Sequence, residues 1–75
     1  MKTIDVLIHV NETIEEAARF WLETSLRNVE GVVKPRFSPQ HHHLMFVAYD
    51  SDYTSAAAIL GQIREHGYGA QIVAI

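Results

Sequence analysis

Cysteine is absent from this chain of 75 residues. The protein therefore has no disulfide and no thiolate ligand, so its stability has to come from packing or from association. Soft ions such as Cu(I) and Hg(II) prefer thiolates, which excludes a cysteine site for them here. The length predicts one small domain, residues 1–75, in which nearly every apolar side chain is needed for the core.

Basic residues are also scarce. Six Lys and Arg against nine Asp and Glu give a formal net charge of −3, whereas nucleic-acid-binding proteins carry clustered positive charge. Residues 1–5 read MKTID, without the basic start and apolar stretch of a secretion signal or membrane span. We therefore expect a cytoplasmic protein whose partners include neither nucleic acid nor membrane.

The first third of the chain predicts a strand and a helix. Residues 3–10 alternate in hydrophobicity, as in a strand buried on one face. Thr13 and Glu16 have the spacing of a capping box, which predicts that a helix begins there. Phe20 lies opposite the apolar stripe of this helix, as a single exposed aromatic or part of a contact surface. The predicted stripe consists of Ile14, Ala18, Trp21, Leu22, Ser25 and Val29.

The rest of the chain predicts a hairpin, a second helix and a last strand. Residues 32–37 are expected at a sheet edge, because Pro35 cannot donate a ladder hydrogen bond. The apolar run 43–49 suits a central strand, and residues 70–75 form the final strand. The order βαββαβ predicts an α+β, ferredoxin-like sandwich, in which two helices cover one face of a four-stranded antiparallel sheet of order 4-1-3-2.

Three stretches resemble the heavy-metal-associated domains of copper chaperones, mercury-binding proteins and metal-pumping P-type ATPases. Residues 23–32 (ETSLRNVEGV) are similar to the family's "E..L..l.GV" signature, residues 47–50 to its "V.yd" strand end, and residues 63–70 (IREHGYGA) to its closing "I...GY.A". The resemblance implies the same fold and a role in metal binding. The family's M-x-C-x-x-C motif is missing, because Thr13, Glu15 and Ala18 stand at its methionine and cysteine positions.

Histidine and carboxylate side chains gather in the connections that the predicted topology brings to one end of the sheet. Such donors suit Zn(II), Ni(II), Co(II) or Cu(II). Alternate residues of a hairpin share a face, which favours the pair His41 and His43. The alternative is a solvated polar tip, and His9 is interpreted as a surface residue. The candidate ligands of a divalent ion are His41, His42, His43, Glu15 and His66.

The sheet face away from the helices is predicted to be apolar, whereas a lone domain would carry a mostly polar outer face. Contiguous exposed apolar groups mark an interface. We expect self-association or a protein partner here, unless the stems of Lys34 and Arg36 cover part of the face. The predicted interface residues are Leu7, Leu44, Phe46, Val73 and Ile75.

Catalysis and RNA binding are not indicated. The chain has no glycine-rich phosphate loop and no nucleophile with an evident base, and Glu15 with Glu16 is explained by helix-start capping. Residues 46–49 resemble the end of an RNA-recognition strand motif, but the residues before them lack its basic and aromatic lead. Two functions remain open, namely divalent metal binding through the hairpin histidines and protein interaction through the apolar sheet face.

Overall fold

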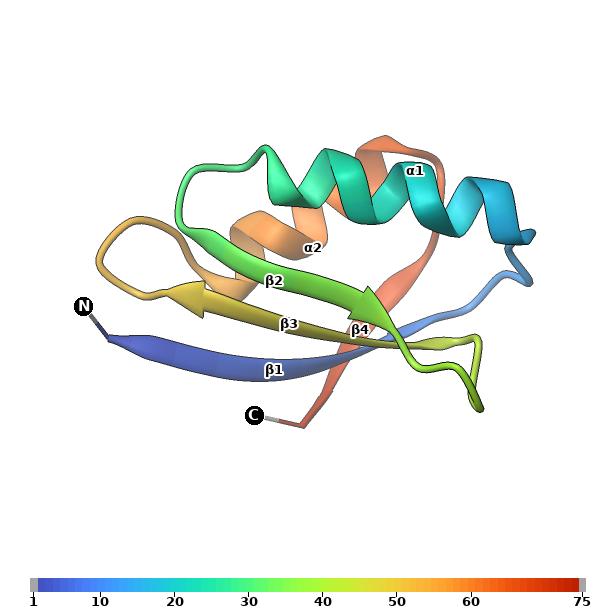
Figure 1. Cartoon of the computed structure of the whole chain (residues 1–75), viewed down its shortest axis with the longest axis horizontal. Helices are drawn as coiled ribbons and strands as arrows, with labels where there is room; N and C mark the ends of the chain where they lie inside the picture. The colour runs from blue at the N-terminus through green and yellow to red at the C-terminus, as the bar shows by residue number, and fades with distance from the viewer. Residues whose placement is uncertain (1, 75) are drawn as a thin grey trace.

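The structure, a computed structural model, describes residues 2–74. The four strands form one antiparallel sheet in the order β2-β3-β1-β4, and both helices lie on one side of it (Figure 1). This confirms the ferredoxin-like prediction, including the strand order. The elements are β1 (Thr3–Val10), α1 (Glu16–Arg27), β2 (Val32–Phe37), β3 (Leu44–Asp50), α2 (Ala56–Glu65) and β4 (Ala70–Ala74).

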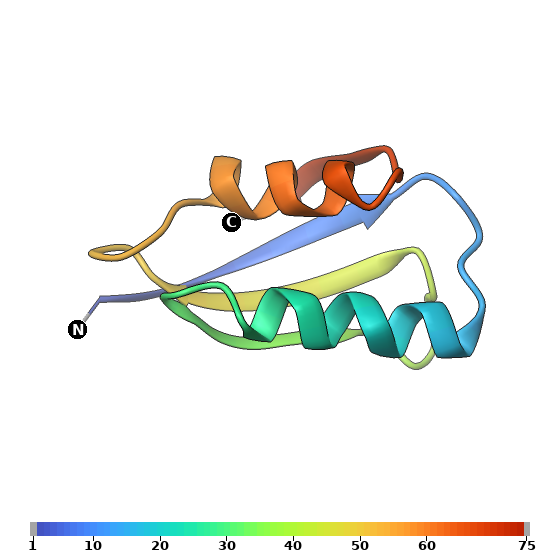
Figure 2. The same ribbon diagram turned by 90° about the horizontal axis from the view of Figure 1, so that it is seen from above.

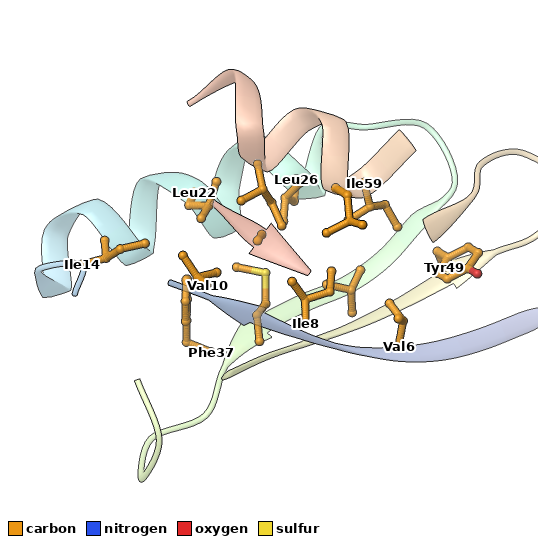
Figure 3. Close-up of a cluster of buried hydrophobic side chains, with 14 residues drawn as sticks. Val6, Ile8, Val10, Ile14, Leu22, Leu26, Phe37, Tyr49 and Ile59 are labelled. Carbon is orange, nitrogen blue, oxygen red and sulfur yellow. The ribbon is translucent and has the colours of Figure 1, made fainter. Parts of the chain in front are cut away.

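The core fills the space between the helices and the sheet (Figure 3). Alternate residues of β1 and β3 point into it, as the pleat of a strand requires. The two helices close the core from above with leucine and isoleucine side chains. Its most deeply buried members are Val6, Ile8, Val10, Leu26, Met45, Val47, Ile59 and Ile63.

β2 lies at the edge of the sheet, as Pro35 predicted. Pro35 itself is fully buried. Its burial leaves no backbone donor without a hydrogen-bond partner, because proline has no backbone N–H. At the end of β2, the backbone N–H of Phe37 donates to a carboxylate oxygen of Glu23 at 2.7 Å. A side chain of α1 thus satisfies an edge donor that would otherwise be open to another strand.

α1 begins later than the capping box predicted. Its first residue is Glu16, and the preceding Glu15 is extended, at φ −66° and ψ 157°, without a capping bond from its side chain. The capping-box prediction is wrong because Ile14 is drawn into the core at 4% exposure. The chain turns into the helix only after the extended Glu15. The guanidinium of Arg19 donates to the Ile14 carbonyl at 2.6 Å and holds this approach.

The placement of Trp21 in the buried stripe of α1 is also wrong. Its side chain is 66% exposed, next to Phe20 at 59%, and the two rings meet edge-on with centroids 5.7 Å apart. The buried residues of the helix are Leu22 and Leu26. The side of the helix that carries these leucines therefore faces the core, and Trp21, one residue earlier, is turned out toward solvent.

Among the described residues, no helix is long and apolar enough to cross a membrane.

Candidate functional site

Three connections meet at one end of the molecule: the β1–α1 loop, the β2–β3 hairpin and the α2–β4 turn (Figure 2). Backbone hydrogen bonds join them, from Val10 N to His43 O at 2.7 Å and from Asn11 N to Gly69 O at 2.8 Å. A carboxylate oxygen of Glu12 also accepts from Gly69 N at 2.8 Å. The shared rim expected from the topology is therefore present and firmly bonded.

The hairpin that carries three histidines is shaped by Ser38. This side chain is buried, at 7% exposure, and its hydroxyl oxygen accepts from His41 N at 3.2 Å and from Gln40 N at 3.4 Å. Leu44 N then donates to His41 O at 2.9 Å and starts β3. A small side chain with an acceptor is what a turn of this kind needs at its first position. The turn fixes where the histidines stand.

The structure does not bring the predicted metal ligands together in one place. His41, His42 and His43 line an open hollow together with His9. His66 instead lines a separate groove beside Trp21 and Tyr68. Glu15 is exposed at the start of α1. His42 makes a hydrogen bond of 3.2 Å to the carbonyl of Pro39 in its own turn.

His9 and His43 form a pair that the sequence interpretation missed. Their rings are stacked, with centroids 5.5 Å apart and 12° between their planes. In the pairing of β1 with β3, His9 lies opposite Leu44. His43 comes just before β3 begins, in the turn, so the alternation of a strand does not fix the direction of its side chain. The contact with His9 follows from the shape of this turn, which the hydrophobic pattern of each strand does not contain.

The hydrogen bonds of the pair leave nitrogen lone pairs free. His43 Nδ1 lies 2.7 Å from the carbonyl oxygen of Val10. A carbonyl only accepts, so this Nδ1 carries the proton, and Nε2 of the neutral ring keeps its lone pair. His9 Nδ1 lies 3.2 Å from Asn11 Oδ1 and 3.4 Å from Gln71 Nε2. Donation to Asn11, the shorter contact, gives His9 the same tautomer, an arrangement typical of metal-binding imidazoles. In this tautomer the Nδ1 of His9 does not accept from Gln71 Nε2, which is itself a donor.

The donor set decides which ions fit. Within residues 2–74, no group of three or more His, Cys, Asp or Glu side chains is placed to hold a metal ion. The chain has no cysteine, so a thiolate site for Cu(I) does not fit, and the thioether of Met45 is fully buried. Two imidazoles suit a borderline divalent ion that takes its remaining ligands from water or from another molecule.

The outer face of the sheet forms rows of side chains across the strands. Arg36, Phe46 and Leu7 pair in one row. Phe46 is 44% exposed, while Leu7 is half-buried. Val73, predicted on this face, is 55% exposed but lies at the irregularity of β4, between Ile72 opposite Ile8 and Ala74 opposite Leu7. Ile75, also predicted here, lies outside the described residues.

The basic residues of β2 cover only one side of this face. Lys34 and Arg36 are exposed, and they border a hollow that also contains Phe46 and Ala48. Across the sheet, Lys34 pairs with Ala48 and Ala48 with Asp5. The apolar surface is thus flanked by two cations on β2 and by one carboxylate on β1.

Known proteins match this chain in structure. No protein-family model and no curated protein matches it by sequence. A copper-binding domain from HMA7, a P-type ATPase, is 24% identical with a TM-score of 0.84, covering 93% of each chain. Oxidized MerP from Ralstonia metallidurans CH34 is 21% identical with a TM-score of 0.83, covering 95% of this chain and 97% of that one. The yeast copper transporter domain CCC2A is 26% identical with a TM-score of 0.82, covering 93% and 94%.

These neighbours define the class of the protein by its fold. It has the architecture of a heavy-metal-associated domain over almost its full length, as residues 23–32 and 63–70 predicted. It is a divergent form of that architecture without cysteine.

Proposed function

We propose that this protein binds a borderline divalent metal ion, Zn(II) foremost and otherwise Ni(II), Co(II) or Cu(II), at the histidine-bearing end of its sheet. His43 and His9 are the ligands, and His41 stands beside them. The observation that carries the proposal is the stacked His9–His43 pair, with the Nδ1 of His43 bonded to the Val10 carbonyl. Structural neighbours include copper-binding domains, which agrees with a metal-handling role.

The surroundings of the pair support an exchangeable site. Val10 and Asn11 hold the two rings through their Nδ1 atoms, as outer partners of metal-ligating histidines do. The hollow is open and both imidazoles are half-buried. An ion held by two protein ligands keeps open coordination positions. Such a site suits transfer of an ion better than its permanent storage.

Removal of one imidazole tests the site. His43→Ala is expected to weaken Zn(II) binding at least about tenfold, because half of the protein ligands are lost. His9→Ala should have an effect of similar size, whereas His41→Ala should have a smaller one. Isothermal titration of tag-free protein measures the affinities, and far-UV circular dichroism confirms that each variant is folded.

His66→Ala and His42→Ala are the matched controls for that titration. Each removes an imidazole, but His66 lines the groove beside Trp21 and His42 is bonded within its own turn. Wild-type affinity is expected in both. Equal loss in all five variants, or unchanged binding in His43→Ala, would show that the ion is held elsewhere.

The outer sheet face supports a second function, as a protein-interaction or oligomerisation surface. The observation that favours it is Phe46, which is 44% exposed at the centre of a row between Leu7 and Arg36. A contiguous apolar surface of this kind is typical of an interface. Without metal, this face binds weakly to a second copy of the chain or to another protein.

A charge placed on this face tests that function. Phe46→Asp is expected to reduce any self-association of metal-free protein in a sedimentation series, since an ionised carboxylate would have to be buried. Val33→Asp is the control, because Val33 is 51% exposed beside Gly31 and Tyr53, away from the outer face. If both variants sediment like an associated wild type, the contact lies on another surface.

A further inference from the structure

We infer that the metal site is completed by a second copy of this chain, so that one Zn(II) ion joins two protomers through the His9 and His43 of each. This inference rests on the proposed function. The first argument is the number of donors. The described residues offer no third side chain for the ion, whereas protein-bound Zn(II) is tetrahedral and most stable with four protein ligands. Two identical pairs supply that number.

The second argument is the position of the pair on the fold. His9 belongs to the outer face of β1 and lies opposite Leu44 of β3. The same hollow contains both histidines and Leu44, and Leu44 is followed on this face by Phe46. The candidate ligands therefore border the apolar surface directly. A copy that covers this surface also reaches the histidines.

The third argument is symmetry. In a two-fold dimer the same patch is used by both partners. An axis that runs nearly along the strands over β3, which lies between β2 and β1, passes beside His9 and brings both histidine pairs to one point. It also lays the two outer faces on each other at a small angle, as aligned sheets pack. The apolar row with Phe46 and Leu7 is then covered in both copies.

The charges on the face agree with this arrangement. Lys34 and Arg36 are exposed on β2, and Asp5 is exposed on β1. The axis turns the β2 side of one copy toward the β1 side of the other, so that a cation of each faces the carboxylate of its partner. Exposed ion pairs of this kind add little affinity, but they favour one orientation over others.

The experiment measures mass and metal content together. Tag-free protein is studied by light scattering after gel filtration, first with a chelator and then with increasing Zn(II). The mass is expected to rise from 8.5 kDa to about twice that value, with one ion per two chains. His9→Ala and His43→Ala should stay monomeric with Zn(II). Phe46→Asp should keep the histidines and weaken the dimer at least about tenfold, as loss of a central aromatic anchor does.

The outcomes separate this inference from the proposed function. If one Zn(II) binds per chain and the mass stays at that of a monomer, the bridged dimer is overturned and metal binding stands. If Zn(II), Ni(II), Co(II) and Cu(II) all fail to bind to wild type, the proposed function fails and the bridged dimer fails with it. A dimer that forms equally with chelator, or in His43→Ala with Zn(II), also overturns the bridge, because association then does not need the ion.

Discussion

Leu26→Ala is expected to lower the free energy of unfolding by about 2–5 kcal/mol. Leu26 is fully buried where α1 packs on the sheet, so its truncation removes apolar contacts and leaves a cavity that the neighbours fill only in part. The total stability of small domains is about 5–15 kcal/mol, and a chain of 75 residues without disulfides belongs at the lower end. Urea unfolding followed by far-UV circular dichroism measures the change.

Trp21→Ala on the same helix is the control. The truncated side chain is larger, but it is 66% exposed, so the cost is expected to stay below about 1 kcal/mol. A cost equal to that of Leu26→Ala would mean that α1 is rotated about its axis and that Trp21 faces the core, as its sequence spacing predicted. The comparison therefore tests the orientation of the helix as well as the packing.

Gly31→Ala is expected to cost about 2–4 kcal/mol, the sum of a left-handed backbone and a steric clash. Gly31 has φ +94°, and a Cβ built on it lies 2.8 Å from Cβ of Tyr53 and 3.1 Å from Cγ2 of Thr54. Its carbonyl also accepts from Asp50 N at 2.7 Å. The loop after α1 is thus pressed against the loop after β3, and no atom there is the end of a long flexible side chain.

Gly67→Ala separates the two contributions. Gly67 has nearly the same backbone angle, φ +92°, but nothing lies within 4 Å of a Cβ built there. Only the conformational cost of about 1–2 kcal/mol is expected. Both variants are compared in one urea series, and equal losses would contradict the close approach of Tyr53 to Gly31.

The fold could be predicted from the sequence because its signals are local and agree with one another. Alternation in residues 3–10 gave the first strand, and Pro35 gave the edge of the sheet. The late start of α1 follows from the burial of Ile14 in the core, and the exposure of Trp21 follows from the rotation of the helix about its axis. That rotation turns Leu22 and Leu26 to the core, and a helical period does not contain it.

The candidate site was predicted in part for a similar reason. The topology brought the hairpin histidines to the end of β1, but the contact of His43 with His9 depends on the conformation of the turn before β3, because His43 lies outside the strand. His66 was grouped with the hairpin because its turn shares the rim, whereas its side chain lies beside Trp21.

The bonds that join Asn11 and Glu12 to Gly69, and Val10 to His43, give this rim its shape without help from an ion. The ligands are preorganised, so the entropy of ordering them is lost during folding and not during metal uptake. In zinc fingers, by contrast, the chain is unfolded without its metal. In the proposed function, the ion therefore arrives and leaves while the domain stays intact, and the empty molecule is expected to remain folded, although a bound ion would add stability by mass action.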